Sequence, residues 1–202
     1  QDSLPYFLTL NNLVNNKRFT NYYNGDYFNK KSDSFFMEEK IQLFTTDYFD
    51  GIPFNNERRM TPSEYTDGEG FTKRIWNSQP EFEVDLPNLF LNGPNSTIEV
   101  LAYSSNHNTD VIVNNFNHNF GISLNTKSNV ISSRNTLGYE KINLKTGINS
   151  NNLKIKTKLY IGELTYSGSQ FNLCFVKITY PKSFHFISSE IFIVNSDLKN
   201  NY

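Results

Sequence analysis

The feature that most constrains the fold is an alternation of apolar and polar side chains with a period of two. In the segment 153–159, Leu, Ile, Thr and Leu alternate with three lysines, and in 174–180 every second residue from Cys174 to Tyr180 belongs to the apolar side. A period of two is that of a β-strand with one buried face. Pro181 then ends the second strand, because proline has no N–H to donate to the ladder.

Other segments repeat this pattern. In EFEVDL (81–86), three apolar residues alternate with three carboxylates, and STIEVLAYSS (96–105) is predicted as a further strand. In DVIVNN (110–115), the pair Asn114-Asn115 can form a hairpin turn, because asparagine tolerates positive φ. The chain is therefore predicted to be all-β, an antiparallel β-sandwich of the jelly-roll kind. Its predicted core includes Phe82, Val84, Ile98, Val100, Val176, Ile178 and Tyr180.

Length and composition fit one sandwich with an extension. The chain has 202 residues, with 18 Phe and 12 Tyr to fill a core, and 30 asparagines but a single alanine. Few good helix formers remain, which favours strands and turns. We expect residues 1–80 to form an N-terminal β extension with a long loop, packed on a β-sandwich core of residues 81–202.

The segment 45–77 is predicted to be a long surface loop inserted before the sandwich. It contains Asp-Gly, Ile-Pro and Thr-Pro pairs, which interrupt regular structure. Long loops without regular structure are often functional. By contrast, strands are expected at 34–44, 139–144 and 183–194, with a polar connection at 125–136.

Net charge and cysteine count exclude several classes of protein. The formal charge is −1 at pH 7, so the chain lacks the basic surface of a nucleic-acid binder and is not strongly attracted to anionic membranes. A single cysteine excludes an internal disulfide framework. LPYFLTL near the N-terminus is too short to span a bilayer and has no basic lead-in of a signal peptide.

No activated nucleophile is expected. Cys174 lies in the middle of a predicted strand on its apolar side, where a free cysteine packs as a small hydrophobic residue. His107 and His118 flank the strand at 110–114 but match no zinc spacing, and with His185 they are interpreted as scattered turn histidines. This chain is therefore not expected to be an enzyme by itself.

Four acidic residues of the 45–77 segment are candidates for a cation site: Asp47, Asp50, Asp67 and Glu69. Carboxylates in a glycine-containing loop are ligands for calcium, but the regular spacing of an EF-hand is missing. A structural calcium and a solvated acidic loop are both compatible with this pattern, and no other cofactor is expected.

Aromatic residues of the same segment are candidates for contact with a partner or a glycan: Tyr65, Phe71 and Trp76. If exposed, they would form a platform with Tyr22 and Tyr23 that stacks on sugar rings or binds a protein. If buried, they would pin the segment to the sheet, which is the commoner fate of large aromatic residues.

Several segments together resemble a known family: SFFMEEKIQLF, YTDGEGFTKRIW followed by EFEVDLPNL, STIEVLAYSS with DVIVNN, and LCFVKITYPKSF. Their order is similar to that of the β-rich region that precedes the catalytic domain in gingipain-type cysteine peptidases, in particular the PorU-like sortases of the type IX secretion system of Bacteroidetes. The sequence departs from the family at Asn115, where relatives have a turn glycine, and at Cys174, where they often have aspartate. No Cys–His dyad of the family can be placed before Tyr202.

The resemblance implies a non-catalytic portion of an exported protein at the cell surface, associated with the outer membrane. This portion would support a downstream peptidase domain or dock on a component of the type IX secretion system, without binding nucleic acid and without a transmembrane segment of its own. The alternative from the residues is a glycan-binding β-sandwich that uses Tyr65, Phe71 and Trp76. The sequence leaves both possibilities open.

Overall fold

The computed structural model describes residues 34–52, 66–105, 118–136, 138–164 and 169–184. They belong to one compact unit, Ser34–Tyr202. Within these ranges the chain forms ten β-strands and one short 3₁₀ turn. No helix in them is long and apolar enough to cross a membrane.

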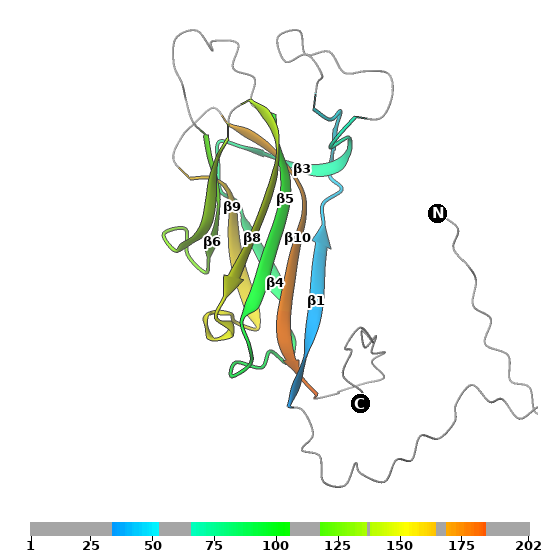
Figure 1. Cartoon of the computed structure of the whole chain (residues 1–202). Coiled ribbons are helices and arrows are strands. Elements are labelled where there is room, and N and C mark those ends of the chain that lie inside the picture. The colour runs from blue at the N-terminus through cyan, green and yellow to red at the C-terminus, as the bar shows by residue number, and fades with distance from the viewer. Residues whose placement is uncertain (1–33, 53–65, 106–117, 137, 165–168, 185–202) are drawn as a thin grey trace, which may run out of the picture. The chain divides into compact units, whose positions relative to one another are not determined.

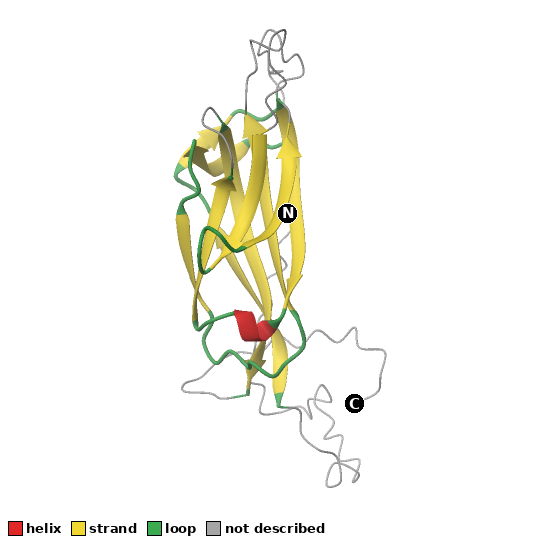
Figure 2. Cartoon of the chain, turned by 90° about the vertical axis from the view of Figure 1, so that its left-hand side faces the viewer, coloured by secondary structure: helices red, strands yellow, loops and turns green. Residues whose placement is uncertain are grey.

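The strands form two antiparallel sheets that pack face to face (Figures 1 and 2). The first sheet has the order β2-β3-β10-β5-β8, and β1 also pairs with β10, whereas the second has the order β4-β9-β6-β7. The predicted all-β antiparallel sandwich is confirmed. The elements are β1 (Phe35–Leu43), β2 (Asp47–Phe49), β3 (Gly70–Trp76), β4 (Glu81–Asp85), β5 (Ser96–Ser105), β6 (His118–Leu124), β7 (Val130–Thr136), β8 (Tyr139–Ile148), the 3₁₀ turn η2 (Ser150–Asn152), β9 (Lys156–Glu163) and β10 (Gln170–Ser183).

The core lies between the two sheets and explains the alternation in the sequence. Ile98, Ile142 and Ile178 of the first sheet form one buried cluster with Phe120 and Leu159 of the second. β4, β5 and β6 contribute alternate side chains to this cluster, because successive side chains point to opposite faces of a sheet. All seven residues predicted to be core are at most 5% exposed, which confirms the predicted inward face of each strand.

Strand β10 organises the first sheet. β5 pairs with one edge of β10. On the other edge, β3 pairs with Gln170–Leu173 and β1 pairs with Phe175–Ser183. At Cys174 the register with β5 shifts by one residue, which is a β-bulge. The predicted place of Cys174 on the apolar face is therefore wrong. The bulge lets Leu173 and Val176 both face the core and leaves Cys174 only partly buried.

The segment 45–77 contains two strands where the sequence predicts a loop. β2 and β3 pair with each other, with Tyr48 opposite Phe71. Gly70 begins β3, the other glycines and the prolines of the segment lie outside the two strands, and the Phe, Thr, Ile and Trp of β3 are good strand formers. Residues 53–65 lie outside the described ranges.

Two further strand boundaries differ from the prediction. β7 occupies most of the expected polar connection at 125–136, because it lies at the margin of the second sheet, where polar side chains can face water. β9 begins at Lys156, later than the alternation predicts. The Thr157 hydroxyl accepts from the backbone N–H of Lys154 and donates to its C=O, and this turn leaves Ile155 61% exposed.

Some predictions fall outside the part of the chain that the structure describes. These are the hairpin at Asn114-Asn115 with its strand at 110–113, and all but the first residues of the strands expected at 183–194. The division into residues 1–80 and 81–202 stays a prediction.

Candidate partner-contact site

β3 exposes two aromatic side chains to solvent, one on each face of the strand. Phe71 is 66% exposed and Trp76 is 55% exposed, whereas the intervening Ile75 is buried in the core. The interpretation that these residues pin the segment to the sheet is therefore wrong for Phe71 and Trp76. Their contact with a partner stays a prediction, and Tyr65 lies outside the described ranges.

Phe71 and Trp76 do not form one continuous platform. They lie at the two ends of β3 on opposite faces of the strand, roughly 17 Å apart along it. Phe71 packs edge-on against Tyr48, with the ring centroids 5.7 Å apart. Trp76 is opposite Gln170 of β10 on the outer face of the first sheet, the face directed away from the core. The structure thus offers two separate exposed features, the aromatic pair Tyr48–Phe71 and the single ring of Trp76.

Two of the four acidic candidates hold the connection between β2 and β3. Glu69 accepts hydrogen bonds from the Tyr48 hydroxyl and from the backbone N–H of Thr66. Both bonds lower the pKa of the Glu69 carboxyl, and the bond from Tyr48 is the larger cause. Asp67 accepts a hydrogen bond of 3.1 Å from the Tyr103 hydroxyl. These carboxylates are therefore engaged by local donors.

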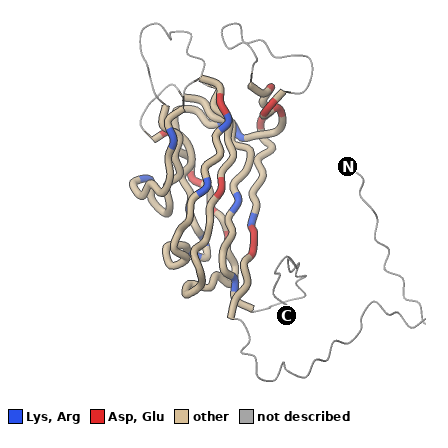
Figure 3. Tube along the Cα trace, viewed as in Figure 1, with Lys and Arg blue, Asp and Glu red and all other residues tan. Residues whose placement is uncertain are grey.

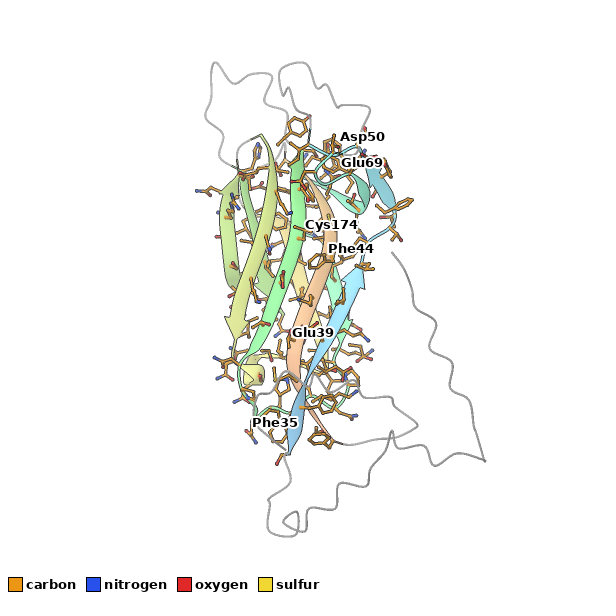
Figure 4. All side chains as sticks on the ribbon, turned by 45° about the vertical axis from the view of Figure 1, so that its right-hand side comes forward. Phe35, Glu39, Phe44, Asp50, Glu69 and Cys174 are labelled. Atoms are coloured by element: carbon orange, nitrogen blue, oxygen red, sulfur yellow. The ribbon has the colours of Figure 1, made fainter. Side chains whose placement is uncertain are left out.

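The other two acidic candidates take part in different hydrogen bonds, Asp47 through its carboxylate and Asp50 through its backbone. The Asp47 carboxylate accepts a hydrogen bond of 2.9 Å from the backbone N–H of Arg74. The backbone C=O of Asp50 accepts a hydrogen bond of 2.7 Å from the Thr66 hydroxyl. Figure 4 shows Asp50 and Glu69 at the same end of the sandwich. Within the described ranges, no three His, Cys, Asp or Glu side chains gather in a group that could hold a metal ion. A structural calcium at these residues stays a prediction.

Tyr103 is a further residue of this region, and no motif in the sequence marks it. It lies on the outer face of β5 and is nevertheless only 4% exposed, since Phe49 and the turn at Gly68 cover it. Lys141 Nζ lies 6.0 Å from the centroid of the Tyr103 ring and 4.0 Å from the Asp67 carboxylate. The only signal in the sequence is a large aromatic residue at an outward position of a predicted strand.

Burial suppresses the reactivity of Cys174, the one cysteine of the chain. Burial raises the pKa of the Cys174 thiol to about 11, against a smaller opposite effect of Lys141. The thiol is therefore protonated at neutral pH, whereas the thiolate is the nucleophilic form. Its Sγ lies 3.9 Å from the backbone oxygen of Asn172. The bulge holds a packed thiol, in agreement with the chemistry expected from the sequence.

His118 begins β6 and is buried, whereas the sequence predicts a turn histidine. Its Nδ1 lies 3.7 Å from the carboxylate of Glu163 in β9, and both side chains are at most 4% exposed. Burial lowers the pKa of His118, and the nearby Glu163 opposes this with a smaller effect. Glu163 also accepts a hydrogen bond of 3.1 Å from the backbone N–H of Asn119. The pair therefore links β6 to β9, and His107 and His185 lie outside the described ranges.

No known family model matches the sequence, and neither does any curated protein. Among solved structures, dimeric latent PorU from Porphyromonas gingivalis is similar with a TM-score of 0.53 and 11% sequence identity, over 76% of this chain and 13% of the PorU chain. The fold is related to a part of PorU. This likeness concerns the fold alone, and the chain spans only a small part of that protein's length.

Two other solved structures are less similar. The K3 cleaved adhesin domain of Lys-gingipain from Porphyromonas gingivalis has a TM-score of 0.36 and 10% identity, over 69% of this chain and 90% of that domain. The CBM36-1 domain of a multidomain xylanase from the hindgut metagenome of Trinervitermes trinervoides has a TM-score of 0.39 and 9% identity, over 70% of this chain and 96% of that domain.

The outer face of the second sheet carries a row of ion pairs between β4 and β9. Lys158 Nζ lies 2.7 Å from the carboxylate of Glu81, which also accepts a hydrogen bond of 2.6 Å from the Tyr160 hydroxyl. The contact with Lys158 is the main cause that lowers the pKa of Glu81, and it raises the pKa of Lys158. Figure 3 shows Lys and Arg interspersed with Asp and Glu along the strands. Exposed pairs of this kind add little stability.

Proposed function

We propose that this chain is a non-catalytic β-sandwich module of a larger exported protein at the cell surface. In that protein it supports a peptidase domain or docks on a component of the type IX secretion system. The observation that carries this proposal is the likeness to PorU, which covers 76% of this chain but only 13% of that protein. The order of the strand segments, which resembles that of gingipain-type proteins, supports the same assignment.

The contact surface in this proposal lies on β3 and its neighbour β2. Trp76 and Arg74 share the outer face of β3 and are both exposed, while Tyr48 and Phe71 form the exposed pair at the other end. Tryptophan, tyrosine and arginine are enriched among the hot-spot residues of protein interfaces. Tryptophan and tyrosine bury a large area at a small cost in conformational entropy. A partner that covers Trp76 would therefore gain much of its affinity there.

The first test is the coding sequence that follows Tyr202. The proposal expects an open reading frame that encodes a peptidase domain with a His–Cys dyad. A reading frame that ends at Tyr202 would contradict the version of the proposal in which the module supports a covalently attached peptidase domain. Docking on a separate secretion component would then be the version to test.

The second test uses Trp76, the only tryptophan of the chain. Its fluorescence is followed while the chain is titrated with the peptidase domain of its own protein and, separately, with a panel of oligosaccharides. We expect a response to the protein partner. Calorimetry should show that Trp76→Ala weakens this binding by about 30-fold, as for a hot-spot residue worth about 2 kcal/mol.

The matched control is Leu91→Ala, which removes a side chain that is 48% exposed and lies outside β2 and β3. It should leave the affinity unchanged. A response to oligosaccharides alone would replace the proposal by a glycan-binding module, since a single exposed indole can stack on a sugar ring. No response to either ligand would contradict a contact at Trp76.

A further inference from the structure

β1 has an edge that no described strand covers. β10 pairs with β5 on one side and with β3 and β1 on the other, so the second edge of β1 faces away from β10. Within the described ranges, no strand pairs with that edge. Three apolar side chains beside it are exposed: Met37 by 42%, Ile41 by 53% and Leu43 by 69%. A long strand edge with exposed apolar side chains is a template for pairing with another strand.

The backbone groups that point to this open edge can be identified. The N–H of Phe44 donates to the C=O of Cys174 in β10 at 3.0 Å. In an antiparallel ladder, every second residue directs both of its backbone groups to the same neighbouring strand. The even-numbered residues of β1 therefore bond to β10, and the odd-numbered residues from Phe35 to Leu43 present their N–H and C=O groups to the open edge.

We propose that a second copy of this chain pairs with this edge, β1 against β1, about a two-fold axis that passes between the two copies of Glu39. Figure 4 shows Glu39 between Phe35, the first residue of β1, and Phe44, which directly follows the strand. An antiparallel pair about this axis sets Glu38 opposite the partner's Lys40, and the same contact occurs a second time by symmetry. Glu38 also lies 2.7 Å from Lys182 Nζ of its own copy, so the partner's Lys40 is a second cation beside this carboxylate. On the other face of the strands, Met37 lies opposite the partner's Ile41. The sequence of β1 is thus complementary to itself in charge and in apolar character.

Neighbouring registers are less favourable for two reasons. An axis between two copies of Lys40 would set two lysines opposite each other, and like charges at opposed positions destabilise a sheet. Glu39 is also the middle residue of β1 (Phe35–Leu43), so any other register would pair fewer residues of the two strands.

The chosen axis leaves one unfavourable contact, which the surrounding sheet reduces. Glu39 lies opposite the partner's Glu39. In each copy, however, Lys177 Nζ lies 3.9 Å from the Glu39 carboxylate and 3.2 Å from that of Glu99. Two lysines therefore accompany the two facing glutamates. The proposal needs no peptidase and no secretion partner, so it is independent of the proposed function.

Disulfide cross-linking tests the axis in a Cys174→Ser background. In the proposed pairing the two copies of residue 39 are a hydrogen-bonded pair with Cα atoms about 5.5 Å apart, within the range of a disulfide bond. We expect Glu39→Cys to give a covalent dimer upon mild oxidation. Lys40→Cys is the matched control. Its two copies are diagonal to each other, roughly 8 Å apart, and should cross-link poorly.

Sedimentation of the full chain with native β1 measures dimer formation without oxidation. Circular dichroism confirms that each variant is folded. We expect a concentration-dependent dimer whose dissociation constant rises at least about tenfold in Lys40→Glu, because two attractive contacts with Glu38 become repulsive. Lys154→Glu makes the same charge change outside the first sheet and should leave the dimer intact. A monomer at all concentrations, equal cross-linking at positions 39 and 40, or equal dissociation of the two charge variants would overturn the proposal.

Discussion

At the scale of single residues, the described residues other than glycine that have a left-handed backbone are all asparagines. Asn77, Asn88 and Asn125 have φ of +45°, +56° and +61°. Asparagine tolerates this region better than other residues with a side chain, because its short amide can bond locally to the backbone. The abundance of asparagine predicts many turns. It does not show which asparagines adopt positive φ, because that depends on how the flanking strands enter and leave the sheets.

Gly68 is the residue at which the turn beside Tyr103 is most sensitive to substitution. Its φ is +84°, and a Cβ there would lie 2.6 Å from the Tyr103 ring. Gly68→Ala should therefore destabilise the chain by about 2 kcal/mol, from backbone strain and from displacement of the ring. Gly147→Ala is the control, since its Cβ would have no neighbour within 4 Å. Urea denaturation measures both, and equal changes would contradict the packing of this turn on Tyr103.

At the scale of elements, alternation is sufficient to predict the buried face of a strand but not its irregularities. Phe82 and Val84 in β4 and Ile98 and Val100 in β5 are buried as the pattern predicts. β10 contains two alternations, one through Leu173 and one that starts at Val176, and they are out of phase. The change of phase is visible in the sequence and marks the bulge. Reading the strand as one continuous alternation therefore misplaces Cys174.

The burial of Cys174 predicts slow alkylation of its thiol. Its pKa of about 11 compares with an ordinary value of 9.0, so the thiolate fraction near neutral pH is lower by about 100-fold. Alkylation by iodoacetamide at pH 7.5 should be slower than in the denatured chain by a similar factor, and the rate should rise with pH up to about 11. The denatured chain at the same pH is the control. Equal rates in the native and denatured chains would show that the thiol is not buried.

At the scale of the whole molecule, long-range pairing is what the sequence does not reveal. Trp76 of β3 pairs with Gln170 of β10, far along the chain, and β1, the first described strand, also pairs with β10. No local sequence pattern predicts which distant strands pair. The sequence of the 45–77 segment therefore looks like that of a loop, although its β3 pairs with β10. The exposure of Trp76 is not predictable from the sequence for the same reason. Alternation predicts on which face of the strand Trp76 lies, but only the arrangement of both sheets decides whether that face is covered.

The buried pair of His118 and Glu163 predicts how the stability of the whole unit depends on pH. Burial lowers the pKa of His118 below its ordinary value of 6.5 in the folded state. Below that value the unfolded chain binds a proton at this position that the folded chain does not. The free energy of unfolding should therefore be fully retained above about pH 6.5 and fall as the pH decreases through the folded pKa.

Urea denaturation between about pH 7 and pH 5.5 measures this dependence while most carboxylates stay ionised. His118→Gln should be less stable at pH 7, because it disturbs a buried site, but its free energy of unfolding should change less with pH. A variant that carries His107→Gln and His185→Gln is the control for the other two histidines and should keep the slope of the native chain. If His118→Gln kept that slope and the control lost it, the proton uptake would belong to the other histidines and not to the buried pair.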